Sequence, residues 1–396
     1  MKQYDFDELI DRHGTSCVKV DGLKAEYGQT DLLPLWVADM DFRTPDFVVE
    51  ALHRRLKHEI FGYTFPPESY IRAIVDWVKW KQNYEVRPEW LTYIPGIVKG
   101  LAFAIDCFTE KGDGVVIQPP IYPPFRRVPE TLGRQVLENP LKLEGGRYRM
   151  DLDGLENLLE DYPCKALLLS SPHNPGGIVW DAGTLARLAE ICLRHGLLVF
   201  SDEIHSEMAF RPAEQRPFPS VSQTAADHSI TFMAPSKTFN IAGIVSSYAI
   251  VPNEKLREKF FAYLAARELN DGTIFAYTAT EAAYTQGADW LRQMLDYVKG
   301  NLQFVDAYLR ENIPAIKAYP TQASFLSWLD CRELGLKQED LVALFLRAGL
   351  ALNDGASFGT GGEGHMRLNV GCPRSILRQA LHGLKAQCVY VNTNKA

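Results

Sequence analysis

Short apolar segments that alternate with helical patterns constrain the fold of this chain most strongly. Between them, Ala182–His195 places Leu and Ala residues at helical spacing. Several segments are apolar on both faces, which is typical of strands covered by helices on both sides. The alternation predicts an α/β fold with a mostly parallel sheet between helices. The segments are Trp90–Ile94, Val115–Gln118, Arg134–Leu137, Ala166–Ser170, Leu197–Ser201, Ile230–Ala234 and Val245–Val251.

After about residue 252 the pattern changes to long helices and then to short strands. Helical spacing covers Lys255–Leu269 and Thr278–Asn312, with an interruption at Gly287. A chain of 396 residues is long enough for two hydrophobic cores. We expect a large domain over residues 45–285 and a smaller α+β domain over 286–396. Residues 1–44 lack a core of their own, so we expect them to pack on the small domain or on a partner subunit.

The charge and the cysteine content of the chain indicate what kind of molecule it binds and where it is located. The chain has 42 Lys plus Arg against 49 Asp plus Glu, a formal charge of −7, and no run of five like charges. This balance favours a small-molecule partner over nucleic acid or an anionic membrane. Neither an 18-residue apolar stretch nor an apolar N-terminal region is present. The seven scattered cysteines include no CxxC pair, which predicts free thiols and a cytoplasmic location.

Four chemically distinct side chains follow four of the predicted strands. They are Tyr122, Asn174, Asp202 and Lys237. In an open parallel sheet, ligands bind beyond the carboxyl ends of the strands, so these side chains should meet at one edge. Each has a simpler reading alone: Asn174 in a turn, Asp202 as a helix cap, Lys237 as a surface cation. Their joint placement favours a site.

Pyridoxal phosphate is the cofactor whose chemistry uses this set. It needs a lysine amine for its aldehyde, a carboxylate beside its pyridine nitrogen, a donor to its phenolic oxygen and a flat group over its ring. Lys237, Asp202, Asn174 and Tyr122 match these needs in that order. The sequence therefore predicts a pyridoxal phosphate site.

A separate segment is suited to the cofactor's phosphate. Gly96 follows a predicted strand and precedes the predicted helix Leu101–Phe108, so the N–H groups of Ile97 and Val98 can bind an anion. The alternative is that Gly96 only permits a tight turn. Ser236 adds a hydroxyl beside Lys237.

Three strings carry a family resemblance that covers most of the chain. SSPHNPGG, SDEIH and APSKTFNIAG, about 30 residues apart, resemble the class I and II aminotransferases, pyridoxal phosphate enzymes of the type I fold with a seven-stranded sheet. Ala234 and Val245 stand where many members have a serine and a cation, and His205 stands in place of a tyrosine. The resemblance implies that Tyr63 reaches the phosphate of a neighbouring subunit, and hence a homodimer with shared sites.

The strings WVADMDF, FGYTFPP, PPIYPPF, DEIH and PSKTFN resemble one branch, the carbon–sulfur β-lyases of the cystathionine β-lyase type. The resemblance implies release of a thiol, pyruvate and ammonia from cystathionine or a cysteine conjugate. It also implies that Arg367 binds the substrate carboxylate. We expect Trp36, Asp39 and residues 353–358 to form part of the substrate pocket.

Lys237 is the expected base for the substrate α-proton, and Lys237, Tyr122 or Tyr63 the expected acid for the leaving sulfur. An aminotransferase shares the early steps and stays open, as does a regulatory protein that binds the cofactor without catalysis. A metal site at Asp202, Glu203, His205 and Glu207 lacks a second histidine at ligand spacing, so we expect none. His205 is expected to support Asp202 or the phenolic oxygen.

Overall fold

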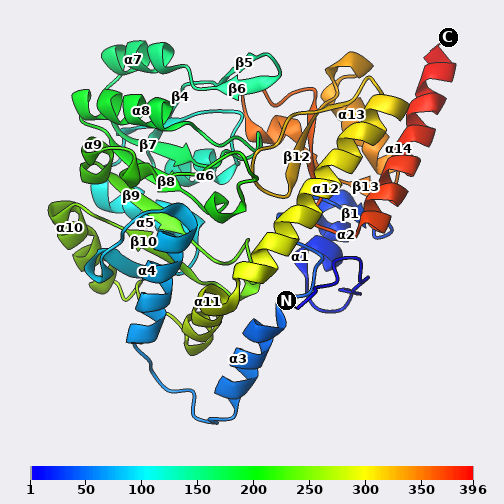
Figure 1. The fold of residues 1–396 in the computed structure, drawn as a ribbon. Helices are drawn as coiled ribbons and strands as arrows, with labels where there is room; N and C mark the ends of the chain where they lie inside the picture. The colour runs from blue at the N-terminus through cyan, green and yellow to red at the C-terminus, as the bar shows by residue number, and fades with distance from the viewer. Residues whose placement is uncertain (1, 396) are drawn as a thin grey trace.

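The structure is a computed structural model that describes residues 2–395. Met1 and Ala396 lie outside the described residues. The structure confirms the predicted α/β sheet (Figure 1), although individual strand ends differ by a few residues. The seven strands run in the order β2-β10-β9-β8-β7-β3-β4, and only β10 is antiparallel to its neighbours. Their bounds are β2 Leu91–Ile94, β3 Gly114–Ile117, β4 Gln135–Glu138, β7 Cys164–Ser170, β8 Leu198–Asp202, β9 Ser229–Met233 and β10 Ser247–Ile250.

Helices cover both faces of this sheet, which explains why its strands are apolar on both sides. On β3, Val115 and Ile117 pack with one buried cluster, while Val116 between them packs with another. The first cluster includes α5 (Ile97–Phe108), α6 (Pro124–Thr131) and α10 (Glu254–Ala265); the second includes α7 (Leu152–Asp161), α8 (Ala182–Arg194) and α9 (Gln223–Asp227).

A smaller antiparallel sheet follows the long helix α12 (Ala288–Asn312), which runs from the large sheet to the small one (Figure 1). Its strand order is β11-β12-β15-β14, with bounds Lys317–Ala318, Leu326–Asp330, His365–Asn369 and Asn353–Asp354. The remaining helices are α3 Asp46–Leu56, α4 Glu68–Gln82, α11 Ile274–Gln286, α13 Gln338–Arg347 and α14 Arg374–Lys395. Short 3-10 helices lie at Pro88–Trp90, Ser206–Met208, Phe218–Ser220, Ala242–Ile244, Arg332–Leu334 and Gly355–Phe358.

The N-terminal segment contacts the second half of the chain. It contains α1 (Val18–Asp21), α2 (Leu23–Tyr27) and β1 (Leu33–Pro34), and β1 pairs in parallel with β13 (Leu350–Ala351). A hairpin of β5 (Lys142–Glu144) and β6 (Arg147–Arg149) is an element that the sequence did not predict. No helix among the described residues has the length and apolar character needed to cross a membrane. The division at residues 44 and 285 stays our proposal.

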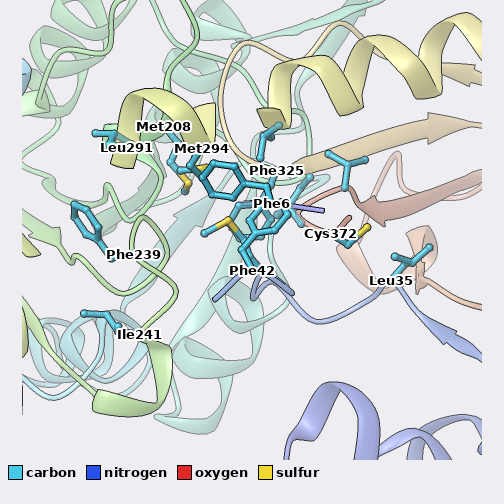
Figure 2. Close-up of a cluster of buried hydrophobic side chains, with 14 of the residues drawn as sticks. Phe6, Leu35, Phe42, Met208, Phe239, Ile241, Leu291, Met294, Phe325 and Cys372 are labelled. Atoms are coloured by element: carbon cyan, nitrogen blue, oxygen red, sulfur yellow. The ribbon is translucent and has the colours of Figure 1, made fainter. Parts of the chain in front are cut away.

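One hydrophobic cluster joins the N-terminal segment to both sheets (Figure 2). Phe6 packs against Phe42 and Trp290, with ring centroids 5.0 and 5.8 Å away. Burying a phenylalanine side chain stabilises a fold by about 2–3 kcal/mol. The N-terminal segment is therefore held where the two sheets meet, next to the carboxyl edge of the larger one. Figure 2 also shows Leu35, Met208, Phe239, Ile241, Leu291, Met294, Phe325 and Cys372 in this cluster.

Candidate active site

A cavity lies at the carboxyl ends of β7, β8 and β9, where the sequence predicts a site. It brings together seven of the predicted residues from five separate segments. The lining residues are Ala38, Ile97, Val98, Tyr122, Phe125, Ser170, Asn174, Asp202, Ile204, His205 and Lys237. Gly96 and Ser236 adjoin the cavity as chain neighbours of Ile97 and Lys237.

Asp202 is the last residue of β8, and its side chain is nearly excluded from solvent. One oxygen accepts a hydrogen bond from the Ile204 N–H at 3.0 Å. Burial raises the pKa of Asp202 to about 6, although this hydrogen bond and the charge of Lys237 lower it. A cation placed against Asp202 would restore the ionised form.

Lys237 is half-buried in the turn that follows β9, and its Nζ donates to the Ala38 carbonyl at 2.5 Å. Burial lowers the pKa of this amine to about 8; Asp39 opposes the shift and Arg367 adds to it. Lys237 is thus deprotonated more readily than a surface lysine, which suits a nucleophile and a base.

His205 lines the same cavity as a neutral imidazole. Burial, followed by the charges of Lys237 and Arg367, lowers its pKa to about 3. Nδ1 is buried without a hydrogen-bond partner. Within the described part of the chain His205 makes no hydrogen bond to Asp202, so its orientation comes from packing, with Phe325 at a ring distance of 6.2 Å.

The start of α5 forms a cradle for an anion. Gly96 caps this helix with a φ of 106°, in a region that disfavours other residues. Since the first N–H groups of a helix have no acceptor within it, those at Ile97 and Val98 are available to a ligand. The helix dipole adds partial positive charge at the same end.

Arg367 on β15 is a buried cation without an acidic partner among the described residues. Its guanidinium donates to Asn174 Oδ1 at 3.1 Å, Asn353 Oδ1 at 2.6 Å and the Trp36 carbonyl at 3.1 Å. Its Nε has no partner. Burial lowers the pKa of Arg367 to about 10. A bound carboxylate would supply both the missing acceptor and the missing charge.

Trp36 lies beside Arg367, but its ring faces away from the cavity. The ring packs with Leu23, Leu32 and Ala351, and its Nε1 donates to the Lys19 carbonyl at 2.9 Å. Only the backbone of Trp36 reaches Arg367.

Asp39 is held by a two-point ion pair with Arg12, at 3.0 and 2.7 Å. Burial alone would raise the pKa of Asp39, but Arg12, Lys19 and Lys237 lower it overall. Asp39 thus lies close enough to Lys237 to affect its charge, without lining the cavity.

Two asparagines that the sequence did not single out fix the segment next to the cavity. Asn369 donates to the carbonyls of Val37 and Asp39, both at 2.7 Å. Asn240 bonds the N–H and carbonyl of Met40, at 3.0 and 2.8 Å. Asn240 ends the string PSKTFN, which is the only signal that could have indicated it.

Tyr63 does not reach the cavity of its own chain. It lies fully exposed on the segment between α3 and α4, which projects from the lower edge of the molecule in Figure 1. Ile60, Phe61 and Phe65 on the same segment are exposed too.

The fold is the type I fold of the pyridoxal-phosphate-dependent transferases, and Lys237 lies at the carboxyl edge of its sheet. The model of the family described as aminotransferase class I and II matches residues 30–384. The chain belongs to this family.

Curated relatives and solved structures match nearly the whole chain. Cystathionine beta-lyase PatB of Bacillus subtilis strain 168 is 43% identical over 96% of this chain and 99% of its own length. Protein MalY of Escherichia coli K12 is 34% identical over 96% and 98%. The structure of cystalysin from Treponema denticola, with pyridoxal 5'-phosphate, has a TM-score of 0.94 at 33% identity, covering 98% of this chain and 100% of the other. The pyridoxal-phosphate-bound C-S lyase from Staphylococcus hominis has a TM-score of 0.91 at 31% identity, covering 98% and 99%.

Proposed function

We propose that the protein is a pyridoxal-phosphate-dependent carbon–sulfur β-lyase. It cleaves cystathionine or another cysteine S-conjugate by α,β-elimination to a thiol, pyruvate and ammonia. The observation that carries this proposal is that Lys237 and Asp202 line one cavity, beside a buried Arg367 that lacks an acidic partner among the described residues. Relatives named cystathionine beta-lyase and C-S lyase support it over most of the chain length.

The residues present fit the cofactor. Asp202 is a buried carboxylate suited to a ring cation, and Ile97 and Val98 offer free N–H groups to a phosphate. Asn174 uses its Oδ1 to accept from Arg367, which leaves its amide nitrogen for an oxygen of the ligand. When bound, pyridoxal phosphate supplies an electron sink for the negative charge that forms on the substrate α-carbon.

Each residue then has a defined task. Lys237 would hold the cofactor aldehyde through its amine and would accept the α-proton of the substrate. Asp202 would pair with the pyridine nitrogen, Asn174 would donate to the phenolic oxygen, and Tyr122 would stack on the ring. Gly96, Ile97, Val98 and Ser236 would hold the phosphate, and His205 would pack beside the ring.

Arg367 binds the substrate carboxylate through its guanidinium, which Asn353 and the Trp36 carbonyl hold in place. Asp39 is a further residue on the substrate side of the pocket, and it acts through Lys237, because its charge raises the pKa of that amine. The departing sulfur takes its proton from Lys237, Tyr122 or Tyr63.

The active unit that we propose is a homodimer. Tyr63 and its apolar neighbours Ile60, Phe61 and Phe65 are exposed on a projecting segment, as expected if they contact a partner. Tyr63 then reaches the phosphate of the partner's site and adds a donor where Ala234 and Val245 offer none. The seven free cysteines support a cytoplasmic location.

Transamination is the second candidate, because the family model is that of the aminotransferases. Both reactions share the residues above until the α-proton has been removed. A regulatory protein that uses the same cavity without catalysis is a third alternative, and turnover at a measurable rate would exclude it.

A substrate screen tests these candidates together. Cystathionine, cysteine and S-alkyl cysteines are incubated with the holoenzyme, and pyruvate and thiol are measured with and without a 2-oxo acid. Pyruvate and thiol in equal amounts without a 2-oxo acid are expected for the lyase. Strict dependence on the 2-oxo acid would contradict the lyase and identify an aminotransferase.

A further inference from the structure

Glu203 directly follows Asp202 but has no task in the proposed reaction. Its side chain is 1% exposed and forms no ion pair within the described residues. Oε1 accepts hydrogen bonds from the Phe218 N–H at 2.7 Å and from Ser201 Oγ at 3.0 Å. Oε2 is buried with no donor. An ionised carboxylate in this place would keep one oxygen without solvation, which is costly.

Gln215, which lies next to Glu203, also has a buried side-chain oxygen without a hydrogen-bond donor. Its Nε2 donates to Ser171 Oγ and to the Arg216 carbonyl, both at 3.0 Å, and lies 3.4 Å from the Ser171 carbonyl. Because two of these acceptors are carbonyls, the orientation of the amide is fixed. Its Oε1 is buried without a donor, although Gln215 lies within hydrogen-bonding reach of Glu203.

We propose that Glu203 is protonated in the folded protein and donates a hydrogen bond from Oε2 to Gln215 Oε1. One proton then satisfies two oxygens that otherwise have no donor. We assign Glu203 the task of a neutral positioning residue that keeps a second negative charge away from Asp202. This second statement rests on the proposed function, whereas the protonation does not.

The surroundings of Glu203 favour the neutral form. The titratable groups that face it are Asp202 at the end of β8, Tyr84 after α4 and Tyr248 on β10. Burial raises the pKa of Glu203 to about 8, and the charge of Asp202 adds to this shift, although the hydrogen bonds from the Phe218 N–H and Ser201 oppose it. Ionised Glu203 would in turn raise the pKa of Asp202 and weaken its pairing with a ring cation.

The same hydrogen bonds connect the carboxyl ends of β7 and β8, which lead to Asn174 and Asp202. Gln215 holds Ser171, whose N–H donates to the Asp202 carbonyl at 2.9 Å. Ser171 also begins the turn that carries Asn174. Neutral Glu203 therefore fixes Asp202 and Asn174 relative to each other.

Unfolding of the apoprotein tests the protonation independently of catalysis. Glu203→Gln reproduces the neutral form, because its carbonyl still accepts and its amide donates to Gln215. The unfolded chain loses the Glu203 proton near pH 4.3, whereas the native protein keeps it to about pH 8. Stability of the wild type should therefore fall with rising pH between these values, by about tenfold in the folding constant per pH unit relative to E203Q.

The matched control is Glu214→Gln, at an exposed neighbouring carboxylate, which should leave this slope unchanged. If E203Q is less stable than the wild type by an amount that stays constant or grows with pH, Glu203 is ionised and the proposal is wrong.

A measurement on the wild type alone keeps the test decisive if E203Q folds poorly. Infrared difference spectra of the wild type, recorded at pH 6 and above about pH 8, should show a protonated carboxyl band at pH 6 that disappears above about pH 8; its absence at pH 6 would overturn the protonation. Pyridoxal phosphate affinity should fall above that pH in the wild type but not in E203Q. An equal fall in affinity in both proteins would show that Glu203 does not act on the cofactor through Asp202. An enzyme that shows the infrared band but has no activity would contradict the proposed function and leave the protonation of Glu203 intact.

Discussion

At the scale of single residues, the site depends on charges that burial has shifted. Lys237, Asp202 and Arg367 each lie in surroundings that disfavour their charged form. Each shift is relieved by a different part of the proposed complex: the aldehyde, the ring cation and the substrate carboxylate. The three residues therefore give separate experimental signals.

Lys237→Ala should abolish both covalent attachment of the cofactor and pyruvate release, because no other amine lines the cavity among the described residues. Borohydride reduction followed by peptide mapping should label residue 237 in the wild type and nothing in the variant. Lys165→Ala, at an exposed lysine on β7, is the control and should behave as wild type.

Arg367→Lys should lower kcat/KM by about 100-fold, mainly through KM, because an ammonium cannot make the paired contacts of a guanidinium. Steady-state kinetics with cystathionine measure this effect. Arg332→Lys changes an exposed arginine of the same domain and should alter kcat/KM less than about twofold. Equal KM values for both variants would show that Arg367 does not bind the substrate.

Cofactor affinity should fall as the pH drops below about 6, the pKa that burial gives Asp202. Protonated Asp202 must lose its proton to pair with the ring cation, so each pH unit below that pKa should weaken binding about tenfold. Absorbance titrations of the apoprotein with pyridoxal phosphate measure this. Asp202→Asn should bind weakly and without this dependence; a wild type with constant affinity would contradict the role of Asp202.

At the scale of elements, the helix ends that frame the large sheet can be tested individually. Asp181 caps α8 by accepting from the Thr184 N–H at 2.9 Å. Asp181→Ala should lower the free energy of unfolding by about 1 kcal/mol, as measured by urea denaturation. The control is Asp161→Ala, at the C-terminal end of the neighbouring helix α7, where the side chain caps no helix. This change should alter the free energy of unfolding by less than about 0.5 kcal/mol.

Elements were predictable wherever a periodic apolar pattern marks them. The strands β7, β8 and β9 are buried on both faces and were predicted from their short, continuous apolar segments. The hairpin β5–β6 was missed because it is mostly exposed and charged, with sequences KLE and RYR. Tyr122, Asn174, Asp202 and Lys237 were identified because the residues after parallel strands meet at one edge. Asn240, Asn369 and the contact of Glu203 with Gln215 depend on partners distant in the chain, which no local pattern marks.

At the scale of the whole molecule, the exposed Tyr63 segment leads to a prediction about mixed dimers. A chain with Lys237→Ala and a chain with Tyr63→Ala should each be inactive or weak alone. If Tyr63 acts in the partner's site, a mixed dimer contains one site with both residues intact, so mixing the two chains should restore activity. Assays after co-refolding measure this; Lys237→Ala mixed with Asp202→Asn is the control and should restore none. No recovery in the first mixture would contradict shared sites.

The hydrogen bond from Arg367 to the Trp36 carbonyl joins residues 331 positions apart. Because β1 also pairs with β13, the carboxylate-binding side of the pocket assembles only after translation has passed Arg367. Lys237 precedes Arg367 in the chain, so the cofactor-binding amine is synthesised before the carboxylate-binding side of the pocket is complete.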